Sequence, residues 1–409
     1  AANTEGDNNV AIGDGALDSN TTGAENVAVG KDALTTNQTG DFNIAIGKDA
    51  LKVNTVSSNT AIGLCAMQAN TTGGVNVAVG YEALENNTTA GENTGVGYRA
   101  LKGNTTGCQN ASFGTCSVYT NSTGDANTGV GYKALFANTT ADNNTAVGFE
   151  ALTDNSTGTV NTAMGRQSLQ NNTTASGNTA YGHNTLNTVT TNGCNTAVGG
   201  SALFNNTTAN NTALGHSALV ANTTGFGTAV GFKAMTANTT SSGGTAMGYQ
   251  ALCSNTTGDD NTAFGLETLS KNTTGASNTA VGRDALEANT TGEENVALGS
   301  NAMLDNTTGS RNVAVGRRAL QENETAEGNT AVGNSAMQNN TTGAGNTAVG
   351  NLALDANTTA NDNTAVGRCA LTTNITGANN VAVGAYSLRD NTGSDNVAVG
   401  AGSALLTTG

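Results

Sequence analysis

The segment NTAVGRDALEANTTGEE, residues 278–294, is one copy of a seventeen-residue unit that runs along the whole 409-residue chain. We number the repeat from its asparagine, so Asn278 is position 1 and Gly282 is position 5. The position-5 glycine recurs in twenty-four copies, seventeen residues apart except for four steps of sixteen that end at Gly63, Gly215, Gly231 and Gly400. A unit this short cannot hold two packed helices. Each copy is therefore predicted to be one rung that buries its apolar side chains only against neighbouring rungs.

The first five positions of the repeat predict a strand that ends at a corner. In the copy Asn26–Gly30, Val27 and Val29 alternate with Ala28, which places the two valines on one face. Position 4, held by Val29, is apolar in every copy, so we expect it to face the core. A glycine in every copy indicates a positive φ or a close backbone approach at the corner. The predicted corner glycines of the first rungs are Gly13, Gly30, Gly47, Gly63, Gly80 and Gly97.

The second half of the rung predicts another short strand and a turn. A small residue and then Leu or Met follow the corner, as in Ala33-Leu34 and Ala66-Met67, and this Leu is the expected second core anchor. Asn-Thr-Thr-Gly then supplies turn residues. Fifty-five glycines, no proline, no tryptophan and 4% aromatic residues predict a thin core. The expected fold is all-β, a parallel β-solenoid or β-roll of about 24 rungs in one continuous array over residues 1–409, without separate caps or linkers.

Position 3 suggests how such coils associate. It is Ala in every copy except Gly95, Ser112 and Gly129, although an outward position facing water should vary among polar and charged types. We expect this face to pack against other chains in a parallel homotrimer. The alternative is that Ala fits a tight space inside a single coil.

The Asn-x-Thr turn has two interpretations. It is the acceptor pattern for N-glycosylation, and the chain has no proline to block it. Residues two apart also share a face, so the asparagines can form an inward ladder of hydrogen bonds from rung to rung, which we favour. The candidates for either role in the first rungs are Asn20, Asn37, Asn70, Asn87, Asn104, Asn121 and Asn138.

The edge after the corner glycine is the most varied part of the repeat. Ten of the fifteen basic residues occupy positions 6 and 7, together with several aromatic residues. This edge is the candidate surface for contact with receptors or glycans, because aromatic and basic groups supply much of the energy of interfaces. The alternative is a solvated edge whose rings shield the next rung. The aromatic candidates are Tyr81, Tyr98, Tyr132, Phe149, Phe232 and Tyr249.

Composition and spacing argue against other functional classes. Thirty acidic and fifteen basic residues leave a net charge of −15, which disfavours nucleic acid and anionic membranes as partners. Apolar runs are too short for membrane insertion. The cysteines are scattered, and only Cys108 and Cys116 could pair within one rung. His183 and His216 lack the spacing of metal ligands. We expect no catalytic residues, no metal and no cofactor.

The motif N-[TV]-A-[VI]-G-x-x-[AS]-L resembles the head repeats of trimeric autotransporter adhesins and related repeats of bacterial and phage tail-fibre-like proteins. The resemblance covers the whole chain. It implies a left-handed parallel β-roll, three parallel chains, and binding to surfaces or receptors. It also implies that Val29, Ile46, Ile62 and Val79 are core residues. The chain departs from the adhesin pattern in its longer unit, its N-T-T-G turn and its lack of a neck, coiled-coil stalk or membrane anchor.

These features together predict a non-enzymatic structural fibre, filament or adhesin rod, extracellular on a cell or virion surface. Its expected partner is itself, as a homotrimer or a head-to-tail filament, with surface glycans or receptors as further partners. Two alternatives stay open. Stacked threonines such as Thr21-Thr22 and Thr71-Thr72 would suit an ice-binding solenoid, and glycosylated turns would suit an extracellular filament subunit.

Overall fold

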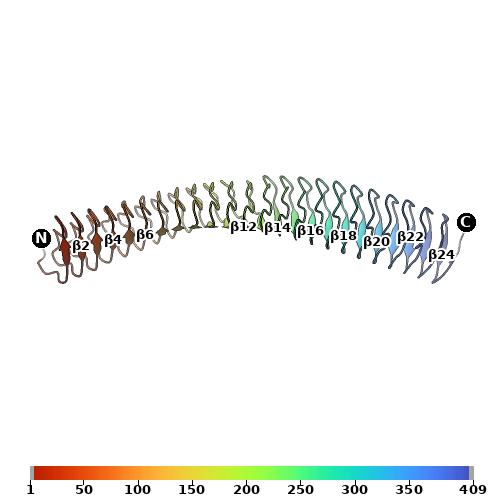
Figure 1. Ribbon diagram of the computed structural model, residues 1–409, viewed down its shortest axis with the longest axis horizontal. Coiled ribbons are helices and arrows are strands. Elements are labelled where there is room, and N and C mark those ends of the chain that lie inside the picture. The colour runs from red at the N-terminus through yellow and green to blue at the C-terminus, as the bar shows by residue number, and fades with distance from the viewer. Residues whose placement is uncertain (1–3, 405–409) are drawn as a thin grey trace. The chain divides into compact units, whose positions relative to one another are not determined.

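The computed structural model describes residues 4–404, in which the chain forms twenty-four short β-strands and no helix. The chain divides into two compact units, residues 1–209 and 210–409, and each is a parallel β-solenoid of twelve rungs. Within each unit every rung contributes one strand, and the rest of the rung is loop (Figure 1). The predicted all-β parallel solenoid is therefore confirmed.

The strands occupy positions 2 to 4 of the repeat, and β14 and β15 also include position 1. In the first unit they are β1 (Val10–Ile12), β2 (Val27–Val29), β3 (Ile44–Ile46), β4 (Thr60–Ile62), β5 (Val77–Val79), β6 (Thr94–Val96), β7 (Ala111–Phe113), β8 (Thr128–Val130), β9 (Thr145–Val147), β10 (Thr162–Met164), β11 (Thr179–Tyr181) and β12 (Thr196–Val198). In the second unit they are β13 (Thr212–Leu214), β14 (Gly227–Val230), β15 (Gly244–Met247), β16 (Thr262–Phe264), β17 (Thr279–Val281), β18 (Val296–Leu298), β19 (Val313–Val315), β20 (Thr330–Val332), β21 (Thr347–Val349), β22 (Thr364–Val366), β23 (Val381–Val383) and β24 (Val397–Val399).

Within each unit the strands pair in parallel and in register. Each position pairs with the same position of the next rung, as Ala28 does with Ala45. The sixteen-residue rungs keep this register, since Ile44 of β3 still pairs with Thr60 of β4. The missing residue lies in the turn, where residues 54–58 read NTVSS. Side chains at the same position of the repeat therefore stack in columns along each unit.

The prediction of a second strand in each rung is wrong. The segment around Ala33-Leu34 is a turn, because Asp32 and Leu34 both have left-handed φ values, 54° and 52°. Its backbone still bonds from rung to rung, and the amide of Leu34 donates to the carbonyl of Ala50 at 2.9 Å. Leu34 itself is fully buried, as expected for the second core anchor.

The orientation of the strand is the reverse of the prediction. Ala28 at position 3 is fully buried, while position 4 points outward and leaves Ile46 and Ile62 each 37% exposed. Val29 and Val79 are also only half-buried, so the core role implied by the resemblance does not hold for these four residues. Position 3 faces inward, as the alternative interpretation requires, in which Ala fits a tight space inside a single coil.

The narrow interior explains why position 3 is small. It lies directly against the position-9 side chain of the turn. A Cβ built on Gly95 would sit 3.3 Å from Cγ of Leu84, and one on Gly129 would sit 2.5 Å from Cγ2 of Val118. Little more than a methyl group fits there. The alanines thus reflect packing inside one coil, and they no longer support contacts between three chains.

The position-5 glycines turn the chain out of the strand. Gly30 has a φ of 138°, and a Cβ there would lie 2.6 Å from the carbonyl carbon and oxygen of Gly47 in the next rung. Both the backbone conformation and the close approach exclude a side chain. Of the other five corner glycines named from the sequence, all have positive φ: Gly13, Gly47, Gly63, Gly80 and Gly97.

Candidate functional site

The turn asparagines at position 12 form a ladder inside each unit. The Nδ2 of Asn104 donates to Oδ1 of Asn87 and to the carbonyl of Gly107, both at 2.8 Å. Asn121 in turn donates to Oδ1 of Asn104 at 2.8 Å. Each side-chain amide therefore forms one hydrogen bond within its own turn and one to the asparagine of the neighbouring rung. The position-12 asparagines named from the sequence are all fully buried: Asn20, Asn37, Asn70, Asn87, Asn104, Asn121 and Asn138.

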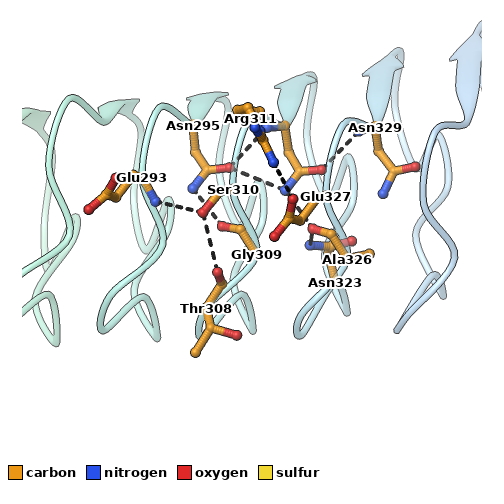
Figure 2. A network of polar contacts seen from close by, with 11 residues as sticks. Glu293, Asn295, Thr308, Gly309, Ser310, Arg311, Asn323, Ala326, Glu327 and Asn329 are labelled. Atoms are coloured by element: carbon orange, nitrogen blue, oxygen red, sulfur yellow. Dashed lines mark hydrogen bonds and ion pairs between the residues drawn. The ribbon is translucent and has the colours of Figure 1, made fainter.

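A second asparagine ladder, which the sequence interpretation missed, runs beside the strands. The backbone amide of Asn312 donates to Oδ1 of Asn295 at 3.0 Å, and Nδ2 of Asn295 donates to the carbonyl of Gly309 at 2.8 Å (Figure 2). The amide of Asn329 continues the pattern by donating to Oδ1 of Asn312 at 2.9 Å. The signal was present in the sequence, because position 1 is asparagine in every copy except Gly227 and Gly244.

The buried ladder bears directly on N-glycosylation. An N-linked sugar replaces a hydrogen on Nδ2 and needs space around that atom. In Asn104 the Nδ2 donates to two acceptors and the side chain has no exposed surface. The folded rung therefore encloses the atom to which a glycan would be attached.

The turn ladder is interrupted where the repeat departs from its pattern. Val189 replaces the position-12 asparagine, and Oδ1 of Asn172 in the preceding rung is left buried without a hydrogen bond. In the shortened turn, Asn54 donates instead to the carbonyl of Val56 at 2.7 Å, and Oδ1 of Asn37 is also unpaired. Each irregularity leaves one buried amide oxygen unpaired, while the surrounding ladder continues.

The two turn threonines have different environments. The position-13 hydroxyl bonds between rungs, as in Thr71, whose Oγ1 donates to the carbonyl of Thr88 at 3.0 Å. At position 14, Thr72 is exposed, and its hydroxyl forms no hydrogen bond with the described residues. Position 13 also holds other residues, such as Gln38 and Glu324, whereas position 14 is Thr in all but a few rungs.

The aromatic edge after the corner is a set of short stacks. Tyr81 and Tyr98 are stacked with ring centroids 5.3 Å apart, and the Arg99 guanidinium lies 5.0 Å from the Tyr98 centroid. Tyr132 and Phe149 are stacked at 5.2 Å. Phe232 and Tyr249 are stacked at 5.3 Å. The rings cover one another's faces and expose their edges, an arrangement that suits shielding of neighbouring rungs better than stacking on a flat sugar ring.

A charged cluster lies on the same edge. Glu82 accepts hydrogen bonds from Nζ of Lys102 at 2.6 Å and from Nε of Arg99 at 2.8 Å. Burial raises the pKa of Glu82, but hydrogen bonds from Lys102, Tyr81 and Arg99 outweigh it and lower the pKa to about 2. The cluster therefore stays ionised over a wide pH range and links two rungs at their surface.

Sites for metals or small molecules are not formed by the described residues. No three of their His, Cys, Asp and Glu side chains converge as metal ligands, and residues 4–404 enclose no pocket. All six cysteines are free, so Cys108 and Cys116 are not paired. His183 lies 3.0 Å from Nη1 of Arg166. No helix able to cross a membrane occurs in the described part of the chain.

Each unit also presents the outward side of its strands, formed by positions 2 and 4, which we call the strand face. Among the described strands its residues are Thr, Val, Ile, Leu, Met, Phe, Tyr and one Ala, without any charged residue. Many of its apolar side chains are exposed. At position 4 these are Ile12, Ile46, Ile62, Phe113, Tyr181, Leu214, Met247, Val281, Leu298, Val349, Val383 and Val399.

Comparison with known proteins adds no identification. No protein-family model matches the sequence, and no curated protein is similar to it. The resemblance to adhesin head and tail-fibre repeats therefore rests on the repeat motif itself.

Proposed function

We propose that this chain is a non-enzymatic structural fibre or adhesin rod that acts outside the cell, on a cell or virion surface. The observation that carries the proposal is the set of side chains that fill the interior of each rung. In most rungs of each unit the inward side chains are Ala, Leu or Met, and the two asparagines, which bond or pack to equivalent residues in neighbouring rungs. The repeat is thus built to extend a ladder.

The mechanical role follows from the bonding. Neighbouring rungs are joined by strand pairing, by backbone bonds in the turns and by two asparagine ladders. Bending or stretching one rung away from the next breaks several of these bonds together. The extracellular location and the binding of receptors or glycans are supported by the adhesin resemblance, and the varied edge of positions 6 and 7 is where a receptor would bind.

The proposal is tested by electron microscopy and small-angle scattering of the whole chain. At the usual spacing of neighbouring strands, about 4.8 Å, each twelve-rung unit should measure about 55 Å along its ladder. Particles with narrow, constant width and units of this length are the expected result. Compact lobes, or particles whose scattering fits a globule, would contradict a fibre.

Ice binding is a second candidate, favoured by the exposed position-14 threonines. The hydroxyl of Thr72 forms no hydrogen bond with the described residues, and β-branching holds such a side chain in few rotamers. In the first unit the position-14 threonines recur at Thr72, Thr89, Thr106, Thr123, Thr140, Thr157 and Thr174. A thermal hysteresis assay tests this candidate, and normal growth of ice crystals in the presence of the protein would end it.

A further inference from the structure

The strand face is exposed, yet it contains no charged residue. Ile62 in β4 is 37% exposed, Val281 in β17 is 40% exposed, and Met247 in β15 is 45% exposed. Position 2 adds a column of Thr and Val beside this apolar column. In the described strands the two columns contain no Lys, Arg, Asp or Glu, although the chain carries 45 formally charged side chains.

Exposure alone does not explain the absence of charge. Position 6, two residues further along the same rung, is exposed to a similar degree, and Leu64 there is 39% exposed. That position carries charged residues in several rungs, among them Asp14, Lys31, Lys48, Arg283 and Arg368. If both columns faced only water, charges would be tolerated in both. Depletion of charged residues is typical of the core of a protein interface.

We propose that the strand face packs against the strand face of a second copy of this chain, a proposal that rests on the fibre function above and names its assembly surface. Two sheets packed face to face interdigitate side chains across about 10 Å, which suits Val, Ile and Thr. An uncharged face offers no opposite charges that could pair with those of a charged partner. The same face of another copy offers the same columns, rung spacing and absence of charge.

The size of the face is adequate for stable association. Twelve three-residue strands make a surface of about 10 Å by about 55 Å, or about 550 Å² in each unit. Counted on both partners, the face of one unit alone buries about 1,100 Å² in total, which exceeds the total of about 1,000 Å² that a specific interface needs. The net charge of −15 repels copies from one another, but no charged side chain lies on the contacting columns.

The experiment is native mass measurement by light scattering on the full chain and on matched lysine variants. Ile62→Lys and Val281→Lys place a charge on the strand face. Leu64→Lys, in the same rung as Ile62, and Leu266→Lys, in the rung before Val281, place the same charge at similarly exposed position-6 sites. Circular dichroism and thermal melting show that each variant is folded before its mass is measured.

The unmodified chain should have a mass of two or more 40.4 kDa copies. Each strand-face lysine should weaken association about a hundredfold, because it buries an unpaired charge, while the position-6 variants should associate normally. A mass of 40.4 kDa for the unmodified chain would overturn the proposal. Equal dissociation of both variant pairs would also overturn it. Extended but monomeric particles would leave the fibre function standing, whereas globular particles would refute that function instead.

Discussion

At the scale of single residues, backbone conformation is the dominant constraint. Besides the corner glycines, each regular rung places three further residues at φ near +50° to +60°, for example Glu82, Leu84 and Glu92. Left-handed conformations are costly for residues with a Cβ, and more so for β-branched ones. They persist here because bonds to the neighbouring rungs hold each of them in place. For example, the backbone amide of Glu82 donates a hydrogen bond to the carbonyl of Leu64, and the amide of Leu84 donates one to the carbonyl of Ala100.

Corner glycines should be much less tolerant of substitution than other glycines of positive φ. A Cβ on Gly333 would lie 2.5 Å from the carbonyl oxygen of Gly350, at a φ of 141°. Gly328, at a φ of 69°, has no atom within 4 Å of such a Cβ. We expect Gly333→Ala to lower the free energy of unfolding by about 3 kcal/mol or more and Gly328→Ala by about 1 kcal/mol. Denaturant unfolding measures both, and equal losses would contradict the role of close approach.

Relief of strain at an exposed left-handed residue should stabilise the protein. Val160 is 60% exposed with a φ of 58°, and the equivalent residue one rung earlier is Asn143, with a φ of 59°. Asparagine adopts this conformation more readily than valine. Val160→Asn should therefore raise the free energy of unfolding by about 0.5–1 kcal/mol in a denaturant titration. A decrease would show that the Val160 side chain makes a stabilising contact.

At the scale of the rung, the sequence identified the strand, the corner, the turn and the buried Leu because each has a residue type tied to one backbone requirement. It did not reveal which face of the strand is inside. Alternation defines two faces, and the larger Val and Ile side chains favoured the wrong one. The inward face is decided by the short distance between the strand and Leu84 across the rung, which leaves room only for small residues such as Ala78 or Gly95. The sequence of a single repeat does not reveal this distance.

The asparagine ladder should tolerate little change. In Asn104→Ala, Oδ1 of Asn87 loses its donor, and Nδ2 of Asn121 loses an acceptor, in a fully buried site. We expect a loss of about 3 kcal/mol, from unsatisfied polar groups and a small cavity. The control Thr106→Ala removes an exposed hydroxyl and should change stability by less than about 0.5 kcal/mol. Similar effects of the two changes would mean that the ladder is not a major stabilising element.

The two rungs that lack the position-1 asparagine show a local compensation. A Cβ on Gly244 would lie 2.5 Å from Cε of Met235, so the methionine occupies space that an asparagine fills elsewhere. Gly244→Asn alone should destabilise the second unit, and Met235→Leu should rescue it. A double-mutant cycle should give a coupling free energy of about 1 kcal/mol or more, and strictly additive effects would disprove the compensation.

At the scale of the whole molecule, the two units should respond differently to acid. In the first unit the pKa of Glu82 is lowered from 4.5 to about 2, so its stabilising contribution is present above pH 4.5 and is lost as the pH falls towards 2. In the second unit, burial raises the pKa values of Asp305 and Asp355, so protonation on acidification favours their folded state.

Hydrogen exchange with mass spectrometry can follow the two units separately. Peptides around Glu82 should lose protection between about pH 4.5 and 2, after correction for the intrinsic pH dependence of exchange, while peptides around Asp305 and Asp355 should keep it. The variant Glu82→Gln should remove most of the pH dependence in the first unit. An unchanged pH profile in that variant would assign the acid sensitivity to other groups.

Because each position pairs with the same position of the next rung, every complete repeat adds the same length to a unit. Deleting one complete seventeen-residue copy from the interior of a unit brings together two rungs whose strands, turns and asparagines already match. Duplication of a copy has the same property. Gene rearrangements in steps of one repeat can therefore lengthen or shorten the protein by a fixed increment of about 4.8 Å without redesign of any contact.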